Sequence, residues 1–124
     1  MIETNFNLTT GILETSFEQN VELKEITNYI QSTKLNKSYP RVLKIMTDAR
    51  DANFSISIDD LEIIMEENKK SLEQYDKIID AIIVNTPEIT AISMLYKEFE
   101  DNEKYFFNIF STKEAAHIWL NSFL

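Results

Sequence analysis

The chain has 124 residues, 44% of them hydrophobic, and its 21 acidic and 12 basic side chains give a net charge of −9. This length and composition are typical of one folded domain, here residues 1–124, whose core needs no disulfide or metal. The negative charge would repel a phosphate backbone or an anionic membrane surface, so we expect no nucleic-acid binding and no stable membrane association.

The scarcity of glycine and the lack of cysteine exclude further classes of protein. Gly11 is the only glycine, whereas nucleotide-binding loops of the Walker and Rossmann types need several. Without cysteine the chain has no disulfide, thiol nucleophile or thiolate metal site. The N-terminus does not resemble a signal peptide, and no apolar run reaches the roughly 20 residues that span a bilayer. We therefore expect a cytoplasmic protein and predict no cofactor.

Two strands open the predicted fold. Residues 2–8 and residues 12–18 both alternate between apolar and polar side chains, which is typical of half-buried strands. Residues 9–11, which include Gly11, are typical of a turn. The pair therefore predicts a β-hairpin.

The hydrophobic period then changes to that of a helix. An apolar stripe predicts a helix over residues 21–32, and the near-continuous apolar run in residues 41–47 indicates a strand that is covered on both faces. Ser57 followed by Asp60 forms a capping box, which predicts the start of the next helix. The apolar stripe of that helix continues to Tyr75.

The last third of the chain repeats this alternation. Residues 78–84, with the sequence IIDAIIV, are apolar nearly throughout and predict a strand, and Thr86 before a proline predicts a helix start. Residues 104–110 predict a strand with apolar groups on both faces, one of which a partner subunit could cover. Ser111 and Glu114 form a second capping box, at the start of the last helix.

The order of predicted elements is therefore β-β-α-β-α-β-α-β-α. Strands that alternate with helices pair in parallel through right-handed crossovers, and the opening hairpin adds an antiparallel edge. The sequence thus predicts an α/β fold with an open, mixed, five-stranded sheet.

This order and several segments resemble the SpoIIAA-like proteins, which are small domains of the STAS and SEC14 type. The resemblance covers nearly the whole chain, and it includes an Asp-x-Arg at Asp48 and Arg50 near the end of a strand. The segments that carry it are FNLTTGILETSFE, LKIMTDARDA, SISIDDLEIIMEEN, DAIIVNTPEITAISMLYKEFE and YFFNIFSTKEAAHIWL. The resemblance implies a SpoIIAA-like fold for the single domain, and these motifs identify a fold rather than an activity.

The resemblance also implies two kinds of function. Anti-sigma-factor antagonists of this family are switched by phosphorylation in an Asp-Ser-Ser/Thr-Gly loop, which is missing here, although Ser55 and Ser57 lie nearby as candidates. A plain N-cap, worth about 1 kcal/mol, is the simpler explanation of Ser57, and Asp59 and Asp60 would repel an added phosphate. The SEC14 branch implies apolar ligands, although larger SEC14 proteins build their lipid pocket with extra helices.

Polar residues that follow the central strands form a candidate ligand or partner surface, because open α/β sheets place ligands at this edge. Arg50 could bind a carboxylate or a phosphate through its several donors. A structural ion pair between Arg50 and a nearby acid is the simpler interpretation, because such pairs are commoner than sites. The members of the surface are Asp48, Arg50, Asp51, Ser57, Asn85 and Thr86.

Three functions remain open at this point. The first is a non-enzymatic regulatory or protein-interaction module of the STAS type, which binds another protein through that surface and could form a homodimer. The second is a carrier of a small apolar molecule or lipid, with a pocket of several hundred Å³ between a helix and the sheet. Adaptable methionines would line such a pocket; they are Met46, Met65 and Met94.

The third function is an enzyme that uses Asp48 or Asp51 as a base. Only the position of these two residues at the end of a strand supports this interpretation, because no nucleophile accompanies their carboxyl groups. The only histidine, His117, has no partners at the spacing of a catalytic triad or a zinc site. The sequence therefore predicts no catalytic residue and no metal site.

Overall fold

A computed structural model describes residues 1–123, within which five strands and four helices follow the predicted order. The strands are β1 (Ile2–Asn7), β2 (Ile12–Glu22), β3 (Val42–Ser55), β4 (Lys77–Ile83) and β5 (Tyr105–Phe110). The helices are α1 (Leu23–Leu35), α2 (Ile58–Ser71), α3 (Pro87–Phe99) and α4 (Lys113–Asn121).

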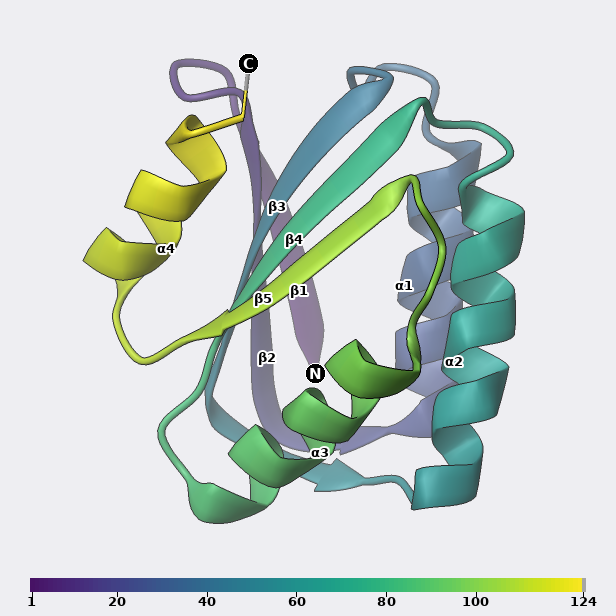
Figure 1. The fold of residues 1–124 in the computed structure, drawn as a ribbon, viewed down its shortest axis with the longest axis vertical. Helices are drawn as coiled ribbons and strands as arrows, with labels where there is room; N and C mark the ends of the chain where they lie inside the picture. Colours follow the sequence, from purple (N-terminus) through teal and green to yellow (C-terminus); the bar gives the residue numbers. More distant parts are fainter. Residues whose placement is uncertain (124) are drawn as a thin grey trace.

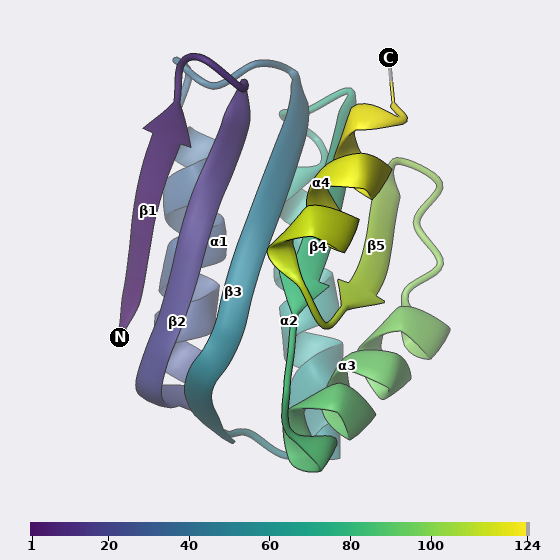
Figure 2. The same cartoon turned by 90° about the vertical axis from the view of Figure 1, so that its left-hand side faces the viewer.

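The strands lie in the sheet in the same order as in the chain, β1-β2-β3-β4-β5. β1 pairs with β2 in antiparallel fashion, and all other neighbours are parallel, as the predicted mixed sheet requires. Because each crossover adds its strand on the same side, α1, α2 and α3 lie together on one face of the sheet. Figure 1 shows α1 and α2 to the right of the sheet, α3 across the lower part of the view and α4 alone to the left, and Figure 2 shows α4 in front of β4 and β5.

Each face of the sheet has its own hydrophobic cluster. Beneath α1, α2 and α3, the cluster contains side chains such as Phe17, Leu61 and Ile82. On the opposite face, Ala116 and Leu120 of α4 are fully buried against β4 and its neighbours. The sheet is therefore covered on both sides near β4, as the apolar sequence of that strand predicts.

The aromatic residues of β5 use both faces of the strand. Phe106 packs against Phe123, with ring centroids 5.4 Å apart, on the side of α4. Phe107 packs edge-on against Tyr96 of α3, at 4.9 Å, on the other side. Helices of the same chain thus contact both faces of β5, one of which we had expected a partner subunit to cover.

β3 is twice as long as the sequence predicts. We expected a strand over residues 41–47 that ends before Asp48, but β3 continues to Ser55. Its second half pairs with β2 alone, because β4 ends opposite Asp48. The expectation that Asp48 and Arg50 follow the end of a strand is therefore wrong: both lie within β3.

An irregularity in β3 explains why the pattern was missed. Ser16 of β2 pairs with Asp48, but Glu18 pairs with Asp51, so β3 has one extra residue between these pairs. Such a bulge interrupts the alternation of side chains between the two faces.

Two alanines mark the effect of this bulge. Ala49 and Ala52 are three residues apart, yet both are buried in the cluster beneath the helices. A regular strand would place them on opposite faces. The spacing therefore fits neither a period of two nor an apolar run, which are the two patterns that reveal a strand in a sequence.

Two of the three predicted helix caps are confirmed. The side chain of Ser57 accepts a hydrogen bond within the predicted capping box, and Thr86 caps α3. At α4 the prediction is wrong by one residue, because Thr112, not Ser111, accepts the hydrogen bond from the backbone of Ala115, at 3.2 Å.

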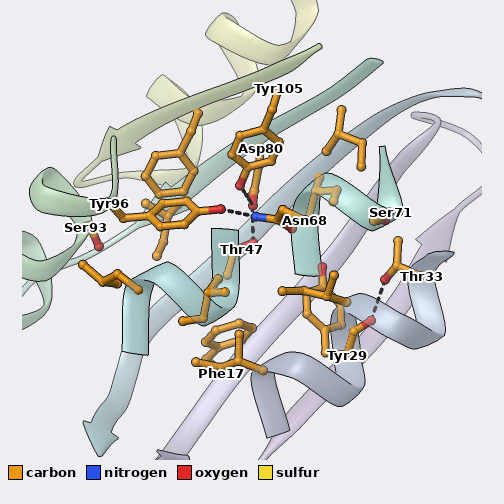
Figure 3. A pocket seen from close by; sticks show the side chains of 18 of the residues that line it. Phe17, Tyr29, Thr33, Thr47, Asn68, Ser71, Asp80, Ser93, Tyr96 and Tyr105 are labelled. Carbon is orange, nitrogen blue, oxygen red and sulfur yellow. Dashed lines mark hydrogen bonds between the residues drawn. The ribbon is translucent and has the colours of Figure 1, made fainter. Parts of the chain in front are cut away.

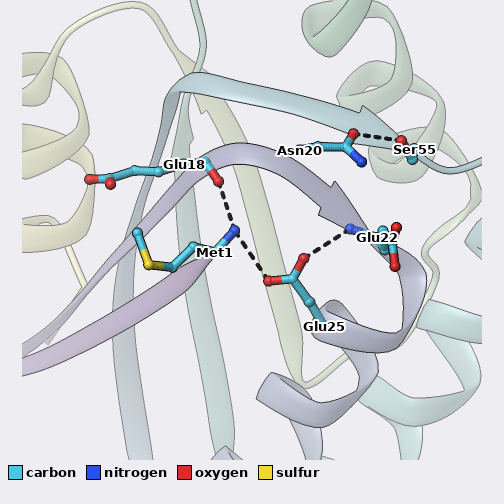
Figure 4. A network of polar contacts seen from close by, with 6 residues as sticks. All are labelled: Met1, Glu18, Asn20, Glu22, Glu25 and Ser55. Atoms are coloured by element: carbon cyan, nitrogen blue, oxygen red, sulfur yellow. Dashed lines mark hydrogen bonds and ion pairs between the residues drawn. The ribbon is translucent and has the colours of Figure 1, made fainter.

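One polar network joins the beginnings of β1 and α1 to the second half of β2. The amino group of Met1 donates to the carbonyl oxygen of Glu18, at 2.7 Å, and lies 3.2 Å from a carboxylate oxygen of Glu25 (Figure 4). The other oxygen of Glu25 accepts the backbone N–H of Glu22. The hydrogen bond from the Met1 amino group lowers the pKa of Glu25.

Replacing the cap of α2 tests the structural role of Ser57. We expect Ser57→Ala to lower the free energy of unfolding by about 1 kcal/mol, because the first turn of α2 loses its acceptor. Urea denaturation measures this change. Ser55→Ala is the matched control, since Ser55 is exposed, and it should change stability by less than about 0.5 kcal/mol. Equal losses in the two variants would contradict a cap at Ser57.

Candidate functional site

Asp48 and Arg50 bind each other on the exposed side of β3. The guanidinium of Arg50 donates to both carboxylate oxygens of Asp48, at 2.9 and 2.7 Å. The backbone N–H of Arg50 also donates to Asp48, at 3.2 Å. Chiefly through the side-chain hydrogen bond, Arg50 lowers the pKa of Asp48. This is the structural ion pair that the sequence offered as the simpler interpretation.

Of the other predicted residues, Asp51 acts on Arg50 through its charge, whereas Thr86 and Ser55 have local partners. Asp51 and Asn85 are exposed, and Thr86 caps α3. Ser55 donates to the side chain of Asn20, at 2.5 Å (Figure 4). Because a strand rises about 3.3 Å per residue, Ser55, a candidate for phosphorylation, lies roughly 20 Å from Asp48. Ser55 is therefore remote from the pair of Asp48 and Arg50.

The structure also contains a cavity of about 110 Å³ between the sheet and α1, α2 and α3. Its floor comes from β2 to β5, and its roof comes from the three helices (Figure 3). Most of the wall is apolar, with side chains such as Ile30, Ile64 and Ile82. The polar residues of the wall are Tyr29, Thr33, Thr47, Asn68, Ser71, Asp80, Ser93, Tyr96 and Tyr105.

Asp80 is the charged residue of this wall. It lies in the middle of β4, and its two carboxylate oxygens accept hydrogen bonds from Thr47, at 3.0 Å, and from Tyr105, at 3.2 Å. Protein surrounds Asp80, but its side chain faces the cavity, so part of the side-chain surface stays accessible. Burial raises the pKa of Asp80 to about 6, against the lowering effect of the two hydrogen bonds.

Tyrosines surround the carboxyl group. Burial raises the pKa of Tyr29, Tyr96 and Tyr105 above the usual range, so all three are protonated and can donate hydrogen bonds. Tyr29 forms a hydrogen bond of 3.1 Å with Thr15. The cavity thus combines an apolar wall with a small number of fixed polar groups, which is the usual composition of a small-molecule site.

α2 and α3 meet across the cavity through a polar contact. The side-chain amide of Asn68 in α2 donates to the hydroxyl of Tyr96 in α3, and both residues are buried. Ser71 and Ser93 add hydroxyl groups from the same two helices (Figure 3). Both α2 and α3 therefore contribute polar groups to the cavity wall. The buried face of an amphipathic helix is usually apolar.

Sequence reasoning missed this site. Asp80 is one polar residue within IIDAIIV, and we interpreted the segment as a strand that is apolar nearly throughout. The predicted methionine lining is wrong. Met46 belongs to the cluster beneath α4, Met65 packs against the cluster beneath α1, α2 and α3 without lining the cavity, and Met94 is 59% exposed. One signal in the sequence could have revealed the site. Asp80 is a single acidic residue in an otherwise apolar strand, and a carboxylate is rarely buried without a partner.

Within residues 1–123, no group of three or more histidine, aspartate or glutamate side chains comes together as potential ligands of a metal ion. Within the same range, each helix is too short or too polar to cross a lipid bilayer.

The comparisons with known proteins concern the fold. No protein-family model and no curated protein matches the sequence. Among solved structures, the chain matches the crystal structure of an uncharacterised protein of the DUF3478 family with a SpoIIAA-like fold, from Shewanella loihica PV-4. The identity is 14%, the match covers 96% of this chain and 93% of that chain, and the TM-score is 0.62. At this identity the likeness shows the fold alone, and the SpoIIAA-like fold predicted from the sequence is confirmed.

Proposed function

We propose that this chain is a non-catalytic binding module that holds a small, largely apolar molecule in the cavity beneath α1, α2 and α3. The observation that carries the proposal is Asp80. A carboxyl group in apolar surroundings costs stability, so its position on a cavity wall is best explained by something that it binds. Perturbed carboxyl groups in cavities are a common property of functional sites.

The size of the cavity limits what it can hold. We expected several hundred Å³ for a carrier, but the volume is about 110 Å³. An engineered apolar cavity of about 150 Å³ binds benzene. The proposed ligand is therefore about the size of benzene or smaller, which argues against a complete lipid.

A binding role fits Asp80 better than a catalytic role. Both of its oxygens already accept hydrogen bonds from hydroxyl groups of the chain. Among the described residues that line the cavity there is no histidine or lysine to exchange a proton with it. Asp80 is thus suited to hold and orient a polar group rather than to transfer protons.

The regulatory role that the fold family suggests can be combined with this proposal. α2 and α3 line the cavity, and both also expose apolar side chains on their outer surfaces. Ile58 and Ile63 of α2 are 58% and 47% exposed, and Met94 of α3 is 59% exposed. A partner protein that contacts these helices could respond to an occupied cavity.

Filling the cavity tests the proposed function. Ser93 of α3 is buried on the cavity wall, so Ser93→Leu should place an apolar side chain in the space of the ligand. We expect affinity for benzene, measured by NMR titration, to fall at least about tenfold. Ser32→Leu on the exposed side of α1 is the control and should leave binding unchanged. If both variants bind like the original chain, the ligand does not occupy this cavity.

Asp80 should also make stability depend on pH. Its pKa is about 6 in the folded chain, against 3.8 for the ordinary group. Between pH 3.8 and about pH 6, the carboxyl group of Asp80 binds fewer protons in the unfolded chain than in the folded chain. The contribution of Asp80 to stability therefore falls as pH rises from about 4 to about 6, and it stays constant above about pH 6. Asp80→Asn should therefore gain stability relative to the original chain across this window, by up to about 3 kcal/mol. Urea denaturation at pH 4, 5, 6 and 7 measures the difference, and a constant difference would contradict this role.

Binding to another protein through the surface around Arg50 stays a second proposal. Arg50 keeps 35% of its side chain exposed, and the charges of Glu114 in α4 and of Asp51 act on it.

A homodimer also stays a prediction. At the free edge of β5, the side chain of Asn108 accepts hydrogen bonds from Lys97 and from the backbone of Ile109, both at 2.9 Å. Side chains thus occupy part of the edge that a second sheet would need.

Replacing Arg50 separates an interaction surface from a structural ion pair. Because the pair with Asp48 is partly exposed, Arg50→Ala should lower the free energy of unfolding by less than about 1 kcal/mol. If the surface binds a partner, capture of that protein from cell extract should weaken. Lys37→Ala, at an exposed position between α1 and β3, is the charge-matched control. A variant that unfolds, or that captures its partner like the original chain, contradicts the second proposal.

A further inference from the structure

The cavity has one charged group on its wall, and that charge is negative. The described residues that line it include Asp80 but no lysine, arginine or histidine. Because the pKa of Asp80 is about 6, the carboxyl group is mostly ionised at neutral pH. An ionised carboxylate in an apolar interior is stabilised most by an opposite charge within hydrogen-bond distance. The chain does not supply this counter-charge in the cavity.

The hydrogen bonds around Asp80 leave acceptors for a ligand. Thr47 and Tyr105 each donate their hydroxyl proton to the carboxylate. The lone pairs that remain on the carboxylate and on the two hydroxyl oxygens can only accept. A carboxylic acid in its ionised form would bring acceptors and a second negative charge. An ammonium group would bring donors and a positive charge.

Aromatic rings complete the surroundings of the carboxyl group. Tyr96, Tyr105 and Phe107 form a cluster on one side of the cavity, with ring centroids 4.9 to 6.1 Å apart. In Figure 3, Tyr105 lies beside Asp80 at the top of the view, and Tyr96 lies to the left of both. Tyr105 turns its hydroxyl end toward the carboxylate, so the rings add apolar surface beside the charge of Asp80.

We propose that the cavity selects a small organic ammonium ion, with its charged group against Asp80 and its apolar part against the isoleucines beneath α1 and α2. This inference rests on the proposed function and adds the chemical class of the ligand. A free amine and a lysine side chain share this chemistry. We assign the site to a free amine, because the cavity of about 110 Å³ is of the size of a small molecule and its wall consists of residues from the sheet and from three helices.

Three probes of similar size test the assignment with the whole chain. They are n-butylammonium, 1-butanol and butyrate, titrated at pH 7.5 and followed through the NMR signals of cavity residues. We expect n-butylammonium to bind at least about tenfold more tightly than 1-butanol, since hydrogen bonds to a charged group are the stronger ones. Butyrate should bind most weakly.

Two variants make the test specific. Asp80→Asn should bring the affinities for n-butylammonium and 1-butanol to within about threefold of each other, and a cooperative urea transition shows that the variant is folded. Asp76→Asn removes one negative charge at an exposed position just before β4, and it should bind all three probes like the original chain.

Each alternative result has a distinct meaning. If 1-butanol or butyrate binds as tightly as n-butylammonium, the ligand class is wrong but the proposed function stands. If no probe shifts the cavity signals, both are wrong and the cavity holds only water. If N-acetyl-lysine N-methylamide binds more tightly than n-butylammonium, the ammonium group belongs to a protein partner, and the assignment to a free amine is overturned.

Discussion

The order of the strands determines where the other parts of this protein lie. β2, β3, β4 and β5 are added one beside the next, and parallel crossovers have one hand, so α1, α2 and α3 all fall on the same face. α1 packs mainly against α2, while α3 packs against β5 at the far edge. The space between these two groups of helices is the cavity. The opposite face is left to the short helix α4.

Asp80 gives this arrangement its chemistry. It occupies a central strand, where the sheet is covered on both faces. The hydroxyls of Thr47 and Tyr105 stabilise the carboxylate without neutralising it. Protein interiors tolerate such a group at a cost in stability, and natural proteins accept that cost mainly where a function requires it.

The fold could be predicted from the sequence, but the cavity could not. Hydrophobic periods and helix caps reveal each element separately, because every one of these signals is local. The cavity joins Thr47, Asp80 and Tyr105, which come from three strands and are brought together by the register of the sheet. No pattern in a single strand contains this information. The methionines were chosen by residue type alone, and that criterion failed.

The bulge in β3 has a consequence for changes in chain length. Deleting one residue elsewhere in this strand would turn every later side chain to the wrong face of the sheet. Deleting Arg50 would instead bring Ala49 and Ala52 to a regular spacing of two, with both still beneath the helices. The alternation of the strand therefore does not require Arg50. The sheet could lose Arg50 without turning its later side chains to the wrong face. The pair that Arg50 forms with Asp48 at the surface is therefore better explained by a role other than folding.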